Sequence, residues 1–176
     1  MIMANFKKMD PKDLAGNPFT MIGSDWMLIA AQKDGKANAM TASWGGLGIL
    51  WNKPVAFIFI RQTRYTKEFV DSSPYFSLNF FDGQFKKELG YFGRVSGRDE
   101  DKISKAGMKV SLGNTEENPL KAPIFDDAKK VFVCRKLFAP KNLDESFIEK
   151  ELLEKFYNKD SQHTLYVGEI EELLTK

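Results

Sequence analysis

The sequence is poor in the residues on which several classes of site depend. Cys134 is its only cysteine and His163 its only histidine. One thiol cannot form an internal disulfide, and a single cysteine suits a reducing compartment. One histidine and one cysteine also do not make a zinc site or a Cys–His nucleophile pair without further ligands. We therefore expect Cys134, which lies in the middle of a predicted strand, to be a small buried side chain.

The chain also lacks an excess of charge and a long apolar run. Its 26 basic and 24 acidic residues leave a net charge of +2, whereas nucleic-acid-binding domains usually carry a clustered basic face. No apolar segment approaches the roughly 20 residues that span a bilayer, and residues 1–18 lack the apolar core of a signal peptide. We expect a cytoplasmic protein with no nucleic-acid and no membrane partner.

What the sequence does have is an apolar, aromatic composition. Phenylalanine occurs 15 times, tyrosine five times and tryptophan three times, and these residue types favour strands. Apolar residues make up 43% of the 176 positions, which is enough for the core of one domain. We expect a single domain over residues 1–176, in which residues 1–19 form an irregular arm because Pro11, Gly16 and Pro18 interrupt any pattern.

Short apolar runs and turn signals predict about six strands with short helical insertions. The strands are expected at residues 26–31, 38–44, 55–60, 75–80, 131–138 and 163–170. A hairpin turn at Asp34-Gly35 joins the first two. Helices are expected at 66–72, 82–90 and 145–157 and after the loop 96–102, whereas 45–48 reads as a flexible connection and 107–130 as loop-rich. The pattern is mainly β and favours an antiparallel barrel.

Two arginines and two threonines follow the most apolar of these strands. Val55-Ala-Phe-Ile-Phe-Ile60 leads directly into Arg61-Gln-Thr63-Arg64-Tyr-Thr66. Guanidinium groups match phosphate oxygens two at a time, and a helix that starts within a residue or two of Thr66 points free N–H groups at the same place. The pattern indicates a pocket for a phosphate monoester. The alternative is a solvated strand end whose arginines pair with surface acids.

Hydroxyl-bearing side chains lie on the strand that precedes this cluster. Period-two alternation places Thr41 and Ser43 on one face of the strand and Met40 and Ala42 on the other. The hydroxyls suit hydrogen bonds to a phosphate or to the hydroxyls of a sugar-like chain. The alternative is ordinary strand alternation with no ligand.

Two further polar residues stand at the ends of strands. Asn79 closes an apolar strand, where it would either face the edge of a ring or cap a turn. His163 opens the last strand, and with an unperturbed pKa near 6.5 it is placed to donate a proton to a substrate. The alternative for His163 is a strand-start histidine that the backbone satisfies.

Several short motifs occur in a fixed order along the chain. They are Asn38-Ala-Met-Thr-Ala-Ser-Trp44, Lys53-Pro54, Arg61-Gln-Thr-Arg-Tyr-Thr66, Tyr75-Phe-Ser-Leu-Asn-Phe-Phe81, Ser96-Gly-Arg-Asp-Glu-Asp-Lys102, Val133-Cys-Arg-Lys136 and His163-Thr-Leu-Tyr-Val-Gly-Glu-Ile170. The ordered set resembles the flavin reductase-like, FMN-binding split-barrel family, in particular its flavoredoxin-type members. The resemblance covers roughly residues 20 to 172.

The resemblance implies an antiparallel split β-barrel, usually a homodimer, that binds FMN near the dimer interface. The flavin ring and ribityl chain would lie along the segment that contains Asn38, Met40, Thr41, Ala42, Ser43 and Trp44. The phosphate would be held by Arg61, Thr63, Arg64 and Thr66. Asn79 and Phe80 would lie beside the ring, and Ser96, Gly97 and Arg98 would complete the pocket from the same or the partner subunit. His163 would lie near a nicotinamide or a substrate.

The function implied by the resemblance is an FMN-dependent oxidoreductase, a flavin or NAD(P)H reductase. It would take hydride from NADH or NADPH, or electrons from another donor, and pass them to a small-molecule or protein acceptor. The glycines at 45–48 do not have the spacing of a dinucleotide fingerprint, so the sequence does not choose between these donors. The alternatives are a non-catalytic FMN-binding electron carrier and a plain β-barrel interaction module with no cofactor.

Overall fold

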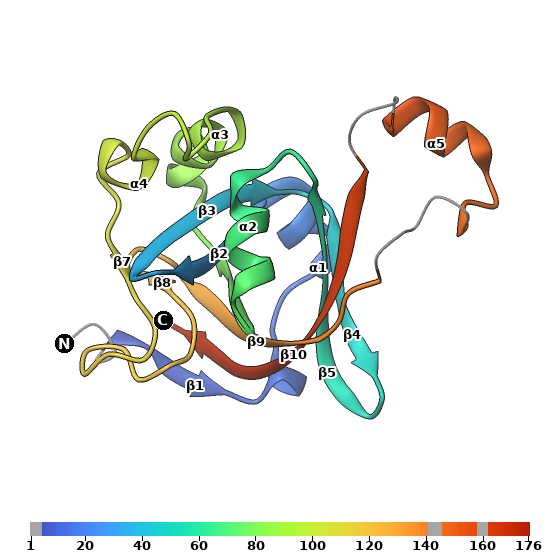
Figure 1. Ribbon diagram of the computed structural model, residues 1–176. Helices are drawn as coiled ribbons and strands as arrows, with labels where there is room; N and C mark the ends of the chain where they lie inside the picture. Colours follow the sequence, from blue (N-terminus) through green and yellow to red (C-terminus); the bar gives the residue numbers. More distant parts are fainter. Residues whose placement is uncertain (1–4, 141–145, 158–161) are drawn as a thin grey trace.

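The framework is one antiparallel sheet of eight strands. The computed structural model describes residues 5–140, 146–157 and 162–176. The strands of the sheet follow the order β3-β2-β6-β9-β10-β5-β4, and β1 pairs with β10 at the side of this path (Figure 1). They are β1 (Lys7–Met9), β2 (Met27–Lys33), β3 (Lys36–Ala42), β4 (Gly45–Leu50), β5 (Lys53–Arg61), β6 (Tyr75–Phe80), β9 (Lys130–Phe138) and β10 (His163–Thr175).

The sheet is not closed, because β3 and β4 stand at the two ends of its order. This arrangement confirms the predicted mainly β, split-barrel fold. A separate short ladder joins β7 (Val110–Ser111) to β8 (Ile124–Phe125) within the loop-rich segment.

Short helices decorate the sheet. They are α1 (Pro18–Thr20), α2 (Tyr65–Ser72), α3 (Lys86–Arg94), α4 (Lys102–Lys105) and α5 (Lys150–Phe156), with shorter helical turns at Pro11–Asp13, Met21–Asp25 and Gly83–Phe85. Figure 1 shows α5 outside the sheet, beyond the start of β10. Among the described residues, no helix is both long enough and apolar enough to cross a bilayer.

Several local predictions need correction. The N-terminal arm is not irregular throughout, because β1 pairs with the end of β10. The segment 45–48 is not a flexible connection: it forms most of β4, whose ladder with β5 pairs Gly46 with Phe57. Glycine has weak strand propensity, so a strand that depends on its neighbour's ladder is hard to see in sequence. These additions explain why the sheet has more strands than the sequence predicted.

The predicted helices are shifted at their ends. Arg64, not Thr66, is the N-cap of α2, a shift of the size that sequence signals allow. α3 continues past Gly90 to Arg94, and the predicted acidic cap Asp82 precedes the short turn before it. α5 covers the second half of the predicted helix 145–157, whose first residue lies outside the described part of the chain.

Two apolar clusters pack on the two faces of the sheet. Alternate residues of β2 divide between them, so that Ile29 packs in one cluster and Leu28 in the other. β9 does the same with Phe132 and Val133. Because both faces of these central strands are covered, their sequences are nearly continuous apolar runs. Cys134 is fully buried as predicted, and burial raises the pKa of its thiol, so it is not a reactive group.

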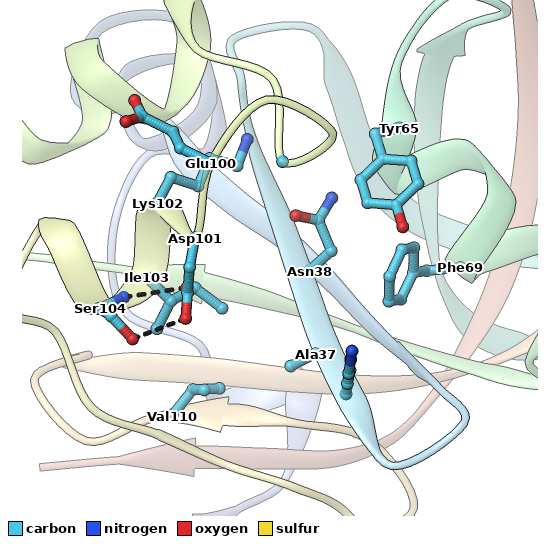
Figure 2. A pocket seen from close by; sticks show the side chains of 12 residues that line it. Ala37, Asn38, Tyr65, Phe69, Glu100, Asp101, Lys102, Ile103, Ser104 and Val110 are labelled. Atoms are coloured by element: carbon cyan, nitrogen blue, oxygen red, sulfur yellow. Dashed lines mark hydrogen bonds between the residues drawn. The ribbon is translucent and has the colours of Figure 1, made fainter.

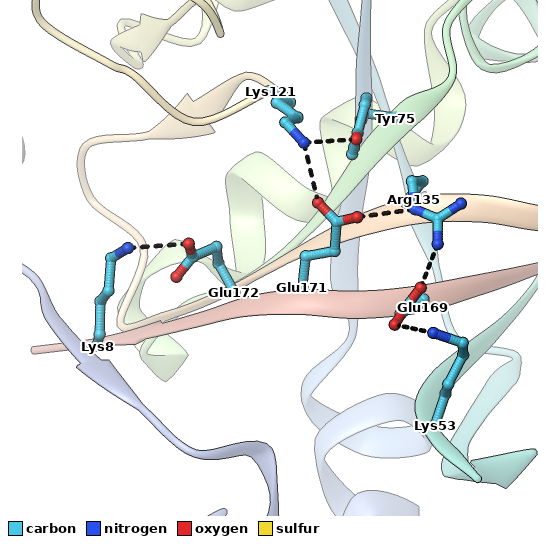
Figure 3. Close-up of polar contacts among 8 residues, drawn as sticks. All are labelled: Lys8, Lys53, Tyr75, Lys121, Arg135, Glu169, Glu171 and Glu172. Carbon is cyan, nitrogen blue, oxygen red and sulfur yellow. Dashed lines mark hydrogen bonds and ion pairs between the residues drawn. The ribbon is translucent and has the colours of Figure 1, made fainter.

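A chain of ion pairs ties three strands together on the outer surface of the sheet (Figure 3). Glu169 of β10 accepts from Lys53 of β5 at 2.6 Å and from Arg135 of β9 at 2.5 Å. Arg135 also pairs with Glu171 at 2.8 Å, and Glu171 reaches Lys121 at 3.4 Å. Each exposed pair stabilises the fold only slightly. Their common effect is to fix the register of β10 against its neighbours, and β10 carries His163 at its other end.

Candidate functional site

Three strand ends and the start of one helix meet around a cavity of about 240 Å³, here called the site cavity. The antiparallel ladder of β5 and β10 brings the last residue of β5, Arg61, opposite the first residue of β10, His163. β3 and the residues after it supply the opposite wall. The lining residues are Met40, Thr41, Ala42, Ser43, Trp44, Phe59, Arg61, Arg64 and His163. Except for Phe59, all of these were predicted from the sequence as one site.

The wall from β3 follows the predicted alternation. Met40 and Ala42 are buried in the core, while Thr41 and Ser43 are half-buried on the other face. The hydroxyl of Thr41 donates to the carbonyl of Leu89 in α3 at 2.5 Å. Its proton is therefore used to hold α3 against β3, and the hydroxyl oxygen faces any ligand as an acceptor.

The arginines of the site are held by main-chain carbonyls. Arg64 Nη1 donates to the carbonyl of Gly93 at 2.7 Å, and Arg61 Nη2 donates to that of Phe156 at 3.2 Å. Gly93 lies in the last turn of α3, where free carbonyls form the negative end of the helix dipole. The pKa of Arg64 is lowered by its burial and by the positive charge of Arg61. Among the described residues, no acid contributes to this shift.

Lys102 is a further cation, missed by the sequence reasoning, that senses the charge of Arg64 but does not line the site cavity. It is 3% exposed, and its Nζ donates to the carbonyls of Phe92 at 3.2 Å and Val95 at 3.1 Å. Burial, and then the charge of Arg64, lower its pKa to about 8. The only sequence signal was its place at the end of the Ser96–Lys102 motif, because a lysine at the start of a helix normally reads as solvated.

His163 is neutral at neutral pH. Burial is the main cause, and Arg61 and Arg64 add to it, so that the pKa of His163 falls to about 4. Its Nδ1 lies 3.1 Å from the hydroxyl of Tyr157, and its ring centre lies 5.3 Å from that of Trp44. At neutral pH His163 is therefore a hydrogen-bonding group and not a charged proton donor. Any donation to a substrate, the role predicted for it, would then come from a neutral imidazole.

The end of α5 covers the site cavity from outside, which the sequence did not indicate. The ring of Phe156 meets that of Trp44 edge-on with centres 5.5 Å apart, and its carbonyl binds Arg61. Tyr157 contacts His163 and lies under the Arg61 guanidinium at 5.8 Å. The available sequence signal was an aromatic pair at the end of an acidic helix, shortly before the only histidine.

Two of the predicted residues line a second cavity, of about 450 Å³ (Figure 2). Asn38 and Gly97 lie there, together with the rings of Tyr65 and Phe69. The amide of Asn38 donates to the hydroxyl of Thr66 at 2.8 Å, and both side chains are nearly fully buried. This bond joins β3 to α2 behind the site cavity, so Thr66 acts here as a structural acceptor.

Gly97 is the place where the 96–98 loop comes closest to β3. A Cβ at this position would collide with the amide of Asn38 and would lie 3.1 Å from the ring of Tyr65. A larger residue would require the Asn38 amide, the Tyr65 ring or the loop to move.

Other predicted residues lie outside the site cavity. Asn79 is fully buried, donates to Ser77 Oγ at 2.9 Å and accepts from the Phe125 N–H at 3.0 Å. Phe80 packs against Phe132 in the core. β6 lies between β2 and β9, so its side chains pack in the interior.

The remaining predicted residues form a surface contact. Arg98 pairs with Glu68 at 2.5 Å, donates to the carbonyl of Thr63 at 3.0 Å and lies over the ring of Tyr65. The hydroxyl of Ser96 accepts from the Arg98 N–H. Pairing with a surface acid was the alternative considered for Arg61 and Arg64. Arg98 makes a pair of this kind, with Glu68.

The chain resembles known proteins in sequence and in fold. The model of the flavin reductase like domain family matches residues 20–176. Comparison with curated proteins gives no match. A crystal structure described as an FMN-binding domain of a flavin reductases-like enzyme from Shewanella baltica has a TM-score of 0.68 at 14% identity, over 97% of this chain and 77% of that one.

Two further solved structures have the same fold. Flavoredoxin from Methanosarcina acetivorans has a TM-score of 0.66 at 24% identity, over 96% of this chain and 76% of that one. An NADH:FAD oxidoreductase from Streptomyces globisporus, solved in complex with NAD and FAD fragments, has a TM-score of 0.62 at 15% identity, over 86% of this chain and 74% of that one. At these identities the structures establish the common fold.

Proposed function

Because this chain belongs to the flavin reductase-like family, we propose that it is an FMN-binding oxidoreductase whose site cavity receives the phosphate end of the cofactor. The observation that supports the proposal is that the positive charges of the site lower the pKa values of their neighbours. Arg61 and Arg64 lower the pKa of His163, Arg61 lowers that of Arg64, and Arg64 lowers that of Lys102. A positive potential of this kind favours an anion.

The residues of the site cavity fit a phosphate monoester. Two guanidinium groups provide charged donors with fixed geometry, and Ser43 adds a neutral hydroxyl. Among the described residues, no carboxylate lines the cavity. The residues therefore bind and orient the phosphate.

The size of the cavity indicates where the rest of the cofactor goes. At about 240 Å³ it is smaller than a typical pocket for a whole ligand of this size, roughly 300–1,000 Å³. We place the flavin ring along residues 40–44, toward the surface that Trp44 reaches with 43% of its area exposed. When bound, FMN supplies the redox chemistry itself, and the protein supplies the anchor and the shielding from water.

We also propose that the chain forms a homodimer. Ile49, Trp51 and Phe138 are exposed at the turn of the β4–β5 hairpin, which is the end of β5 away from Arg61, and at the end of β9, and the rings of Trp51 and Phe138 lie 6.1 Å apart. Exposed apolar side chains that cluster in this way mark interaction surfaces. A homodimer that buries this patch, in the cytoplasm, remains our proposal.

Two kinds of activity are consistent with the site. The similarity to an NADH:FAD oxidoreductase supports a reductase that takes hydride from NADH or NADPH, and the similarity to flavoredoxin supports an electron carrier. The neutral state of His163 does not separate the two activities, because neither can rely on an imidazolium at neutral pH. A small-molecule or protein acceptor would complete either role.

The purified protein tests the proposal directly. We expect the protein to bind FMN stoichiometrically, with visible flavin absorbance. Anaerobic addition of NADH or NADPH should bleach that absorbance if the protein is a reductase. Bound flavin that neither nucleotide bleaches would identify the carrier, and a protein that does not bind FMN would overturn the proposal.

A further inference from the structure

Tyr157 makes a specific contact with the only histidine of the chain. Its hydroxyl lies 3.1 Å from His163 Nδ1, and the two ring centres are 5.4 Å apart at an angle of 86°. The tyrosine follows α5, whereas His163 begins β10, so the contact links the covering helix to the sheet. Tyr157 does not line the site cavity, but His163 does.

The direction of this hydrogen bond follows from the protonation states and available partners of the phenol and the imidazole. Burial raises the pKa of the Tyr157 phenol, so its hydroxyl keeps its proton at neutral pH. Within the described residues, His163 Nδ1 is the one hydrogen-bond partner of this hydroxyl. If Nδ1 carried the imidazole proton, the phenol proton would have no acceptor in the described part of the chain, and leaving a half-buried donor unsatisfied costs free energy.

The opposite arrangement satisfies both groups. A neutral imidazole has one N–H and one lone pair, so a phenol that donates to Nδ1 leaves the proton on Nε2. Burial, with the added effect of the Arg61 and Arg64 charges, keeps the ring neutral, and neither guanidinium group can accept a hydrogen bond from it. The nitrogen that remains available to a ligand in the site cavity is then a donor.

We propose that Tyr157 is a positioning residue that fixes His163 in its Nε2–H tautomer, so that the site presents a neutral N–H donor to an oxygen of the bound ligand. The ligand would be one with an anionic or carbonyl oxygen. This last part rests on the proposed function, whereas the tautomer is a property of the flavin-free protein. Phe156 and the Tyr157 ring hold the phenol in place through their contacts with Trp44 and Arg61.

The single histidine makes the tautomer directly measurable. Protein labelled with ¹⁵N-histidine gives one imidazole in a long-range ¹H–¹⁵N spectrum, in which protonated and unprotonated nitrogens are well separated. In flavin-free wild-type protein at pH 7, we expect a protonated Nε2 and an unprotonated, hydrogen-bonded Nδ1. A protonated Nδ1 in the wild-type protein would overturn the proposal, whether or not any variant folds.

Tyr157→Phe tests the role of the hydroxyl, because it keeps the ring and removes only the donor. Both nitrogen signals should move toward the values of a tautomer mixture. Tyr91→Phe is the matched control, since that hydroxyl binds Glu100 elsewhere and its loss should leave the imidazole signals unchanged. Imidazole signals that are the same in Tyr157→Phe as in the wild type would contradict the proposal.

Binding measurements separate the inference from the proposed function. Tyr157→Phe should lower the affinity for FMN by roughly two- to tenfold, the loss expected for one neutral hydrogen bond. If wild-type protein binds FMN and Nε2–H does not respond to it, the inference about the donor fails while the FMN site stands. If FMN does not bind at all but the tautomer is as expected, the proposed function fails and the positioning role of Tyr157 stands.

Discussion

His163 lies directly opposite Arg61 in the ladder between β10 and β5. Burial is the main reason why the pKa of this histidine is low, and the positive charges of Arg61 and Arg64 lower it further. Among the residues that the structure describes, the lining of the site cavity therefore combines two guanidinium groups with a neutral imidazole and contains no acid. Tyr157 completes the surroundings of the ring from α5.

This arrangement predicts an unusual contribution of His163 to stability at acidic pH. The pKa of His163 is about 4 in the folded protein and 6.5 as its ordinary value. Between these values the unfolded chain binds a proton that the folded chain does not, so the free energy of unfolding should fall as the pH drops from about 6.5 to about 4. The measurement is the denaturation midpoint as a function of pH.

His163→Gln provides the control for the pH prediction. Glutamine cannot titrate, so the variant should lose the part of the pH dependence that lies in this window. Equal slopes in the variant and the wild type would show that other groups cause the acid sensitivity.

The bond between Asn38 and Thr66 predicts a cost in stability when the acceptor is removed. Thr66→Val keeps the shape of the side chain and leaves the buried amide of Asn38 without its partner. We expect a loss of about 1–3 kcal/mol in the free energy of unfolding, measured by denaturant titration. Thr66→Ser retains the hydroxyl and should lose clearly less. A Thr66→Val protein as stable as the wild type would show that the amide finds another partner.

The close approach of Gly97 to β3 predicts that even a methyl group is too large there. Gly97→Ala should destabilise the protein by about 1–3 kcal/mol, because the new Cβ meets the Asn38 amide and the Tyr65 ring. Gly90→Ala is the matched control: it lies in α3, where nothing lies within 4 Å of a new Cβ, and alanine favours helices. Thermal denaturation of both variants checks the contrast. If Gly97→Ala were as stable as Gly90→Ala, the 96–98 loop would not depend on that contact.

The sequence predicted the fold where local signals and tertiary pairing agree. The hairpin between β2 and β3 is an example, since both Asp34 and Gly35 have the positive φ that the tight turn needs. β4 was missed because its glycines give no strand signal, and its ladder depends on β5. A strand stabilised mainly by its neighbour is not visible in a local pattern.

The sequence likewise predicted some residues of the site cavity correctly and misplaced or missed others. Thr41, Arg61 and Arg64 lie together because the strand ends that carry them meet. Asn79 looked like a residue of the site because an amide at a strand end has the same local sequence in either role. Its partner, the N–H of Phe125, comes from the short strand β8, far along the chain. The contact of Phe156 with Trp44 is equally non-local, so no helical pattern in residues 145–157 predicts it.

The phosphate assignment makes its sharpest prediction at Arg64. This guanidinium lines the site cavity and has no carboxylate partner in the described part of the chain. Charged hydrogen bonds of this type contribute about 1.5–3 kcal/mol, which corresponds to roughly ten- to 150-fold in affinity. Arg98→Ala is the matched control, because Arg98 is bound to Glu68 at the surface and should not discriminate between flavins.

The most direct test compares FMN with riboflavin, which lacks the phosphate, by fluorescence titration of the wild type, Arg64→Ala and Arg98→Ala. We predict that Arg64→Ala lowers the affinity for FMN by ten- to 150-fold and changes the affinity for riboflavin by less than about twofold. Arg98→Ala should change neither affinity. An Arg64→Ala protein that weakens FMN and riboflavin equally would contradict the assignment of the site cavity to the phosphate.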